Sequence, residues 1–318
     1  MEAMVQRLFL FTLLIVSCGG GPRSGIEEKA PSRIPAYILV EEEISGRILG
    51  QKLNCPFGLA IDEENRMVVC DAGNDRLIRF DSNFKPVFER GGPGGEAGLL
   101  NNPSHMIFDT DLSLLVSDEG NRRIVRLNRQ LNFVDEIYFY DQDDPIKFGT
   151  SAGVAVTGYG EVWVADREKN QIAIFDNVGQ FDRFVGDFGY SGGQLNQPEK
   201  ILIDQEGNFV VCDAGNSRLV VYDSYGNFDY DIVGDNLVYP IAAAQDGRSF
   251  WVLDNATAQV TLIDYSGAVR FIAGPTLIGN RIPLKEPTDL TMCHDGRMVI
   301  ADGGNDRVLI CRVVYDSE

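Results

Sequence analysis

The sequence is poor in histidine and in basic residues. His105 and His294 are its only histidines, they form no i, i+4 pair, and the chain has no Cys-x-x-Cys. We therefore expect no zinc site of ordinary ligand number and no bound cofactor. The 28 Lys and Arg against 47 Asp and Glu give a net charge of −19. A nucleic-acid-binding face needs clustered basic residues, so we expect no nucleic-acid partner.

The chain also lacks an apolar run long enough to span a membrane. The N-terminal run, Leu8 to Val16, has nine residues, whereas a spanning helix needs about 20. Arg7 precedes this run, and Ile15-Val16-Ser17-Cys18 and three glycines end it. This segment resembles a bacterial lipobox. The resemblance implies that residues 1–17 are a signal peptide and that the thiol of Cys18 carries a lipid, the only membrane contact.

The lipobox implies a cell-envelope location, as a membrane-anchored lipoprotein in the periplasm or at the cell surface. Residues 18–35 are rich in Gly, Pro and charge, which is typical of a flexible tether. The alternative is an ordinary secretory signal with an incidental cysteine. A second acidic segment, Asp141 to Asp144, offers oxygen ligands for calcium. Calcium needs six to eight converging oxygens, so we expect a solvated loop and no metal.

The rest of the chain, residues 36–318, is dominated by a repeat. An apolar run ending in Asp recurs six times with spacings of 47, 48, 47, 41 and 48 residues: Asp71, Asp118, Asp166, Asp213, Asp254 and Asp302. Fourteen or fifteen residues earlier stand Pro56, Pro103, Ser151, Pro198, Pro240 and Pro287. Five residues later stand Arg76, Arg123, Gln171, Arg218, Gln259 and Arg307. Three positions in register over six copies indicate six equivalent structural units.

Each copy has the pattern of four short strands. In the first, Leu59-Ala60-Ile61, Met67 to Cys70, Leu77 to Phe80 and Pro86-Val87-Phe88 alternate with turns rich in Asn, Asp and Gly. Each copy is therefore predicted to be a four-stranded antiparallel meander. Six radial sheets bury their faces on one another and leave only short edges. The sequence predicts an all-β, six-bladed β-propeller, which we expect to be monomeric.

Several copies resemble the NHL repeat. In the fourth, Pro198 to Asp204 is followed by Val211-Cys212-Asp213-Ala214-Gly215-Asn216-Ser217-Arg218 and then by Asp223 to Phe228. The first and sixth copies match similarly, whereas Asn170-Gln171 and Ala258-Gln259 depart from the Asn-x-Arg pattern in the third and fifth. The resemblance extends from about Ile44 to the C-terminus, and it implies the propeller fold without a particular function.

The ring must be closed by a strand from the N-terminal side. The sixth copy ends with its third strand, Arg307 to Val314, and too little chain follows for a fourth. Ile44 to Leu49 precedes the first repeat as Phe181 to Gly186 precedes the fourth. We therefore expect Ile44 to Leu49 to pair beside Arg307 to Val314.

The repeated Asp and Arg residues are interpreted as structural, because a catalytic constellation would not recur in every blade. We expect the Asp to cap the following turn, the nearby Asn to adopt a left-handed conformation, and the Arg to tie neighbouring turns together. The cysteines of the repeats are expected to be free and buried. Cys70 and Cys212 lie three blades apart, too far for a disulfide. A bridge between Cys55 and Cys311 stays open.

Candidate functional residues are those that break the repeat on one face. The third residue of each copy and the residue after each Asp should surround the mouth of a funnel. The third residues are Gly58, His105, Gly153, Lys200, Ala242 and Asp289. The residues after each Asp are Ala72, Glu119, Arg167, Ala214, Asn255 and Gly303. Together with the adjacent Ser104, Glu199 and Glu168, the charged members predict a shaped polar mouth; the alternative is an ordinary solvated surface.

These features predict a module that binds an envelope protein, a peptide or a glycan through the funnel face. A spacer in an envelope complex is a structural alternative. The enzymatic alternative is a metal-dependent hydrolase or lyase of the gluconolactonase or amidating-lyase type, which would use the propeller channel. The resemblance to amidating lyases implies several histidines around a channel metal, and this sequence does not supply them.

Overall fold

The computed structural model describes residues 34–138 and 148–316. The predicted signal peptide, Cys18, nearly all of the tether and the acidic segment Asp141 to Asp144 lie outside the described residues. In the part of the chain that is described, no helix has the length and apolar character to cross a membrane.

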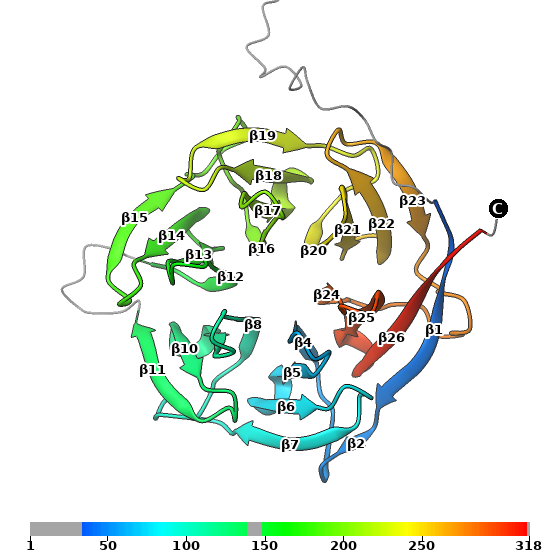
Figure 1. Cartoon of the computed structure of the whole chain (residues 1–318), viewed down its shortest axis with the longest axis horizontal. Helices are drawn as coiled ribbons and strands as arrows, with labels where there is room; N and C mark the ends of the chain where they lie inside the picture. The colour runs from blue at the N-terminus through cyan, green and yellow to red at the C-terminus, as the bar shows by residue number, and fades with distance from the viewer. Residues whose placement is uncertain (1–33, 139–147, 317–318) are drawn as a thin grey trace, which may run out of the picture.

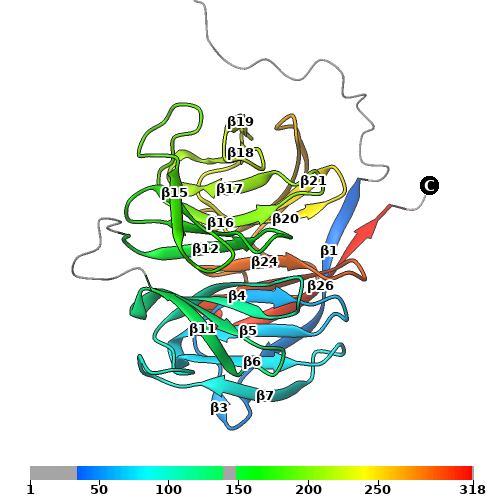
Figure 2. The same ribbon diagram turned by 60° about the vertical axis from the view of Figure 1, so that its left-hand side comes forward.

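Six four-stranded antiparallel sheets are arranged radially around a central axis (Figure 1). Blade one contains β4 (Pro56–Ile61), β5 (Met67–Asp71), β6 (Arg76–Phe80) and β7 (Pro86–Gly91). Blade two contains β8 (Pro103–Phe108), β9 (Leu114–Asp118), β10 (Arg123–Leu127) and β11 (Phe133–Tyr138). Blade three contains β12 (Ser151–Val156), β13 (Val162–Asp166), β14 (Gln171–Phe175) and β15 (Phe181–Val185). The strands of a blade lie side by side from the centre outward, as β4 to β7 do in Figure 2.

The second half of the ring repeats this plan. Blade four contains β16 (Pro198–Ile203), β17 (Phe209–Asp213), β18 (Arg218–Tyr222) and β19 (Phe228–Ile232). Blade five contains β20 (Pro240–Asp246), β21 (Ser249–Asp254), β22 (Gln259–Asp264) and β23 (Val269–Ala273). Blade six contains β24 (Asp289–Met292), β25 (Arg297–Asp302), β26 (Arg307–Tyr315) and β1 (Pro35–Ser45). The predicted all-β, six-bladed propeller is confirmed.

The ring is closed by β1, which pairs antiparallel with β26 from Ser45 opposite Arg307 to Pro35 opposite Tyr315. Closure by an N-terminal strand is confirmed, but the predicted segment, Ile44 to Leu49, is wrong in its bounds. Gly46 has a φ of 75°, which turns the chain out of the sheet because glycine has no Cβ to oppose it. The next residues form a small hairpin of β2 (Arg47–Ile48) and β3 (Gln51–Lys52).

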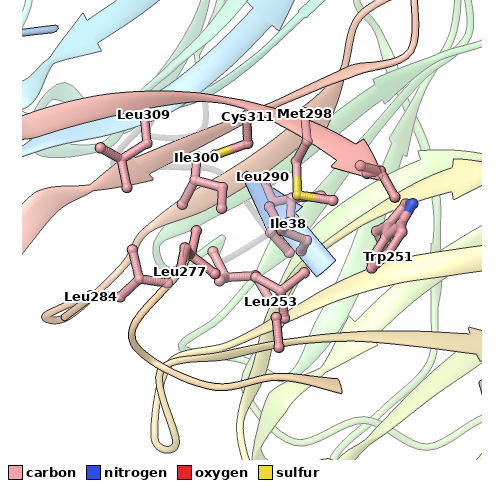
Figure 3. Packing of buried hydrophobic residues seen from close by; sticks show 14 of the residues in the cluster. Ile38, Trp251, Leu253, Leu277, Leu284, Leu290, Met298, Ile300, Leu309 and Cys311 are labelled. Atoms are coloured by element: carbon pink, nitrogen blue, oxygen red, sulfur yellow. The ribbon is translucent and has the colours of Figure 1, made fainter. Parts of the chain in front are cut away.

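The core consists of six apolar clusters, each formed between two adjacent blades. Between blades three and four, the Trp163 and Phe209 rings stack with centroids 3.5 Å apart. Between blades five and six, Trp251 and Leu253 pack with residues that include Ile38 of β1 (Figure 3). Burial between blades, rather than within one, explains why a single repeat would not be stable alone.

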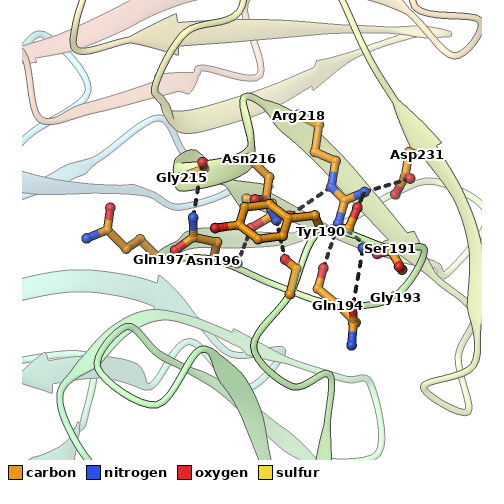
Figure 4. A network of polar contacts seen from close by, with 12 residues as sticks. Tyr190, Ser191, Gly193, Gln194, Asn196, Gln197, Gly215, Asn216, Arg218 and Asp231 are labelled. Carbon is orange, nitrogen blue, oxygen red and sulfur yellow. Dashed lines mark hydrogen bonds and ion pairs between the residues drawn. The ribbon is translucent and has the colours of Figure 1, made fainter.

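The repeated Asp accepts several hydrogen bonds in a buried network. Figure 4 shows part of the network of blade four, around Arg218 and Asn216. In blade four, Asp213 Oδ2 accepts hydrogen bonds from Arg218 Nε and Asn216 Nδ2, both at 2.8 Å. Asp213 Oδ1 accepts a hydrogen bond from the backbone N–H of Asn196, at 2.6 Å. Arg218 also donates to Asp231 on the fourth strand, at 2.8 Å. The same contacts recur around Asp71, Asp118 and Asp302.

Two details of this network differ from the prediction. The Asn of the four regular repeats does not adopt the left-handed conformation, because it lies in a 3-10 turn and its side chain donates to the Asp. The following residue does, with φ values of 53° to 58° at Asp75, Arg122, Ser217 and Asp306. The Asp caps the following turn only in the two irregular blades, where Asp166 and Asp254 accept hydrogen bonds from Lys169 N and Thr257 N.

The cysteines of the described residues, Cys55, Cys70, Cys212, Cys293 and Cys311, are all free. The bridge left open between Cys55 and Cys311 is not formed. Cys55 is exposed rather than buried, whereas the other four are buried. Burial raises the pKa of the Cys311 thiol to about 12, so this thiol stays protonated near neutral pH and packs as a small apolar group.

Candidate functional site

The third residues of the repeats alternate around the axis between small and large. Blades one, three and five carry Gly58, Gly153 and Ala242, and blades two, four and six carry His105, Lys200 and Asp289. The glycines are required by close approach of the innermost strands. A Cβ on Gly58 would clash with the carbonyl oxygen of Ser104, and one on Gly153 with that of Glu199. Of the six third residues, only His105, Lys200 and Asp289 therefore have large side chains.

Lys200 and Asp289 form an ion pair between blades four and six. Lys200 Nζ lies 2.6 Å from Asp289 Oδ1 and donates a second hydrogen bond to the carbonyl oxygen of Leu290 at 2.8 Å. The other carboxylate oxygen of Asp289 accepts a hydrogen bond from the backbone N–H of Leu59 in blade one, also at 2.8 Å. Asp289 is 1% exposed. A buried pair with these additional hydrogen bonds fixes the relative positions of three blades.

A second group of charges lies on blades two to four. Arg167 Nη2 is 2.8 Å from Glu199 Oε2, and Arg167 Nη1 is 3.7 Å from Glu119 Oε1. The side chains of Arg167, Glu119 and Glu199 are 26%, 19% and 8% exposed. Ser104 and His105 of blade two are buried. We call these five residues the mouth cluster.

The environment of the mouth cluster changes its ionisation. Burial raises the pKa of Glu199 to about 7, while Arg167 favours its charged form and Glu119 opposes it. Burial likewise raises the pKa of Glu119. Burial lowers the pKa of His105 well below its ordinary value, and the positive charges of Arg167 and Lys200 act in the same direction. His105 is therefore neutral at pH 7, whereas Glu199 exchanges its proton near that pH.

The raised pKa of Glu199 predicts a pH-dependent stability. Between the ordinary pKa of 4.5 and the folded value of about 7, the folded state binds more protons than the unfolded state, so this group's contribution to stability falls as pH rises. In Glu199→Gln that fall is absent. We expect the free energy of unfolding of the variant, relative to the unmodified protein, to rise by on the order of 1–3 kcal/mol from pH 5 to 8 in urea titrations. A relative stability that falls with pH would show that Arg167 dominates instead.

Three polar atoms of the mouth cluster have no hydrogen-bond partner among the described residues. They are His105 Nδ1, Ser104 Oγ and Arg167 Nε, and all three are inaccessible to solvent. The Ser104 hydroxyl lies beside Glu119 and favours the charged form of that carboxyl group. The His105 ring packs edge-on against Phe57 of blade one, with ring centroids 5.2 Å apart.

The predicted site residues fall into two contact groups. The structure brings Glu119, Arg167 and Glu199 together and, separately, Lys200 and Asp289. Glu168 does not join either group, because its side chain is 50% exposed and pairs with Lys169.

Tyr239 also lies near the mouth cluster, although the departures from the repeat do not predict it as a site residue. Its phenolic pKa is raised by burial and then by the charge of Glu199, which places it beside the mouth cluster. The hydroxyl of Tyr239 also donates to Gln197 at 3.2 Å. The available signal was its position directly before the start of the fifth repeat, where the other five copies have no aromatic residue.

The donor set of the axis does not fit a metal ion. Residues 34–138 and 148–316 contain no group of three or more His, Cys, Asp or Glu side chains placed to hold one. Asp289, on the innermost strand of blade six, is already bound to the ammonium of Lys200, whose positive charge would repel a divalent cation.

The similarity to known proteins supports the propeller fold. A family model described as 6-bladed beta-propeller matches residues 143–269. The chain is 26% identical over 126 residues to the protein brain tumor of Drosophila melanogaster, a match that covers 39% of this chain. This chain spans only 12% of the length of that relative.

Solved structures with a similar fold include lyases. A streptogramin B lyase has a TM-score of 0.64 and 13% identity, covering 90% of this chain and all of that one. The virginiamycin B lyase of Staphylococcus aureus has a TM-score of 0.62 and 12% identity, covering 87% and 100%. A catalytically inactive variant of that lyase with quinupristin has a TM-score of 0.61 and 12% identity, covering 84% of each chain. At such identities the likeness concerns the fold alone.

Proposed function

We propose that this chain is an extracytoplasmic binding module of NHL-type repeats, tethered to a membrane through a lipid on Cys18. Its partner is an envelope protein, a peptide or a glycan, and its binding surface is the mouth of the propeller. The Pro-x-Gly and Asp-x-x-Asn-x-Arg patterns support the repeat type. The apolar run that ends at Cys18 supports the anchor and the location in the cell envelope.

One observation carries the proposed binding role. Charged side chains that break the repeat occupy the mouth of blades two, three and four, where Glu119, Arg167 and Glu199 contact one another while staying partly within reach of solvent. The equivalent positions after the Asp in blades one, four and six are Ala72, Ala214 and Gly303. An asymmetric polar mouth on a rigid scaffold is typical of recognition sites.

A site-specific crosslinking experiment tests the binding role. A photo-crosslinking amino acid is placed at position 168, in the turn on the mouth face of blade three, where it replaces Glu168. The matched control replaces Arg129, an exposed residue in a turn on the opposite face of blade two. In the native envelope we expect an adduct from position 168 that is absent from position 129 and is lost when Arg167→Gln is added. Equal adducts from both positions, or none from position 168, would contradict the proposal.

The anchor is tested separately. Radiolabelled lipid precursor should label the unmodified protein, and the protein should sediment with membranes. Cys18→Ser should abolish both the label and the sedimentation, because a single thiol accepts the lipid. A Cys18→Ser variant that stays with the membranes would show that another feature anchors the chain.

A metal-dependent hydrolase or lyase that uses the channel is the alternative function, and the lyase names of the similar structures make it worth a test. The ion pair of Lys200 and Asp289 on the axis disfavours it. Chelator treatment that removes a copurifying divalent ion and lowers the melting temperature would support the enzyme instead.

A further inference from the structure

We propose that the face opposite the mouth rests on the lipid surface to which the chain is tethered, through three large apolar side chains at the tips of its turns. They are Tyr159 and Val178 of blade three and Tyr225 of blade four, and we call them the back patch. The inference rests on the proposed membrane tether. It adds the surface that contacts the membrane, which leaves the mouth facing away from it.

The members of the back patch are the most exposed large hydrophobic side chains of the described residues. Tyr159, Tyr225 and Val178 are 88%, 77% and 72% exposed. Side chains with this exposure contribute little to the core of the propeller. A single exposed apolar side chain is ordinary, but a group of them on one surface marks contact with a membrane or with another protein.

The three tips belong to one locality of two adjacent blades (Figure 1). The turn of Tyr159 touches the turn of Val178, because a Cβ on Gly160 would lie 3.1 Å from the Cβ of Asn177. Arg183 connects this pair of turns to blade four. Its Nη1 lies 3.4 Å from Glu161 Oε1, and its Nη2 donates a hydrogen bond to the carbonyl oxygen of Tyr225 at 3.2 Å.

The back patch departs from the repeat without being required by it. The turns of this face are held by their first residue: Asp223 Oδ1 accepts a hydrogen bond from the backbone N–H of Tyr225, and Asp81 Oδ1 accepts one from that of Asn83, both at 2.9 Å. The turn therefore forms whatever the third side chain is. At the equivalent third position the other turns have polar residues, which are Glu64, Asn83, Asp111, Gln130, Glu206, Ser266 and Asp295. The apolar tips therefore serve a contact outside the chain.

The place where the tether joins the propeller selects a membrane as the partner. Pro35, the first residue of β1, pairs with Tyr315 at the end of β26 that lies away from the mouth. The chain from Cys18 therefore reaches the propeller on the face that carries the back patch. The segment from Cys18 to Ile34 spans at most about 55 Å, which keeps this face close to a lipid surface. Tyrosine is also enriched where proteins meet the membrane interface.

The charges around the back patch favour a zwitterionic lipid surface. Arg183, the cation beside the patch, is paired with Glu161 and Asp182. The net charge of −19 is repelled by anionic headgroups. Burial of the apolar tips, rather than attraction between charges, would therefore hold this face on the lipid.

Quenching of a tryptophan probe by brominated lipid tests the inference. The chain from residue 18 onward keeps every described residue, and a histidine tag replaces the lipid, so that the result does not depend on modification of Cys18. The protein is bound to phosphatidylcholine vesicles that contain a nickel-chelating lipid. We expect brominated acyl chains to quench Tyr225→Trp far more than Glu168→Trp on the mouth face or Asn83→Trp at the equivalent tip of blade one. The native Trp163 and Trp251 are fully buried and give the same background in each variant.

Removal of the other two tips gives a second measurement. Tyr159→Ser combined with Val178→Ser should lower the equilibrium constant for lipid contact of the Tyr225→Trp probe about tenfold, the effect of losing two apolar side chains that are partly buried in the interface. The ratio of quenched to unquenched fluorescence gives this constant. The matched control is Gln130→Ser, at the position of blade two equivalent to Val178, and it should leave the quenching unchanged.

Three results would overturn the inference. Equal quenching of Tyr225→Trp and Glu168→Trp would show that neither face is turned toward the membrane. Quenching that survives Tyr159→Ser with Val178→Ser would assign the contact to another part of this face. Self-association without vesicles that the same double substitution weakens would assign the back patch to a second copy of the chain. Failure of the lipid anchor is distinguishable, because it removes the label on Cys18 and leaves the quenching of the tagged protein intact.

Discussion

Replacement of Arg123 by Ala is expected to lower the free energy of unfolding by about 3–5 kcal/mol, because it leaves a buried carboxylate without its partner. The Arg123 side chain is 1% exposed. Its Nε donates to Asp118 at 2.7 Å, its Nη1 to Glu136 at 2.6 Å and its Nη2 to the carbonyl oxygen of Leu99 at 2.8 Å. One side chain thus joins the second, third and fourth strands of blade two to the loop that enters it. Urea unfolding followed by fluorescence measures the loss.

The matched control is Arg129→Ala in the same blade. Arg129 pairs with Glu64 at 2.7 Å, but the two side chains are 44% and 58% exposed. Exposed ion pairs contribute about 0–1 kcal/mol, so this variant should be nearly as stable as the unmodified protein. If both variants lost similar amounts of unfolding free energy, the repeated Arg would stabilise its blade no more than an exposed ion pair does.

Replacement of Ile38 by a charged residue is expected to open the ring. Ile38 is 2% exposed and packs with Trp251 and Leu253 across the interface of blades five and six. Ile38→Asp buries an unpaired carboxylate in this cluster, which should cost more than about 4 kcal/mol, a large fraction of the stability of a typical domain. Loss of β1 also exposes the edge of β26. We expect a non-cooperative or early thermal transition in calorimetry.

Tyr37→Asp is the control for this variant, because Tyr37 lies in the same strand and is 37% exposed. It should lower the melting temperature by only a few degrees. If Ile38→Asp and Tyr37→Asp unfold alike, the two faces of β1 are equivalent and the strand does not close the ring by packing. Aggregation of Ile38→Asp alone would agree with an exposed edge strand.

Much of the fold can be predicted from the sequence because the pattern of one blade recurs in six copies. The Asp and Arg positions recur at fixed spacing, and β-strand periodicity between them gives the order of strands in each blade. The bounds of the closing strand were harder to predict. They depend on Gly46, whose positive φ ends β1. The sequence contains 34 glycines, and nothing in it indicates which of them ends a strand.

The candidate site can be predicted only in part. Departure from the repeat identifies Glu119, Arg167 and Glu199, but not which of them touch. The pair of Lys200 and Asp289 joins residues 89 positions apart, and no local pattern encodes a contact across the ring. The acidic partners of the repeated Arg, such as Glu136, lie thirteen residues away on the outer strand, where a charged residue looks like ordinary surface.

A high-resolution crystal structure of the free protein tests most directly whether the mouth cluster is a recognition site. We predict an ordered water or a bound hydroxyl within hydrogen-bond distance of Arg167 Nε and His105 Nδ1, the atoms that have no partner among the described residues, since buried polar atoms require one. Direct hydrogen bonds from both atoms to protein groups, with no guest, would contradict the account.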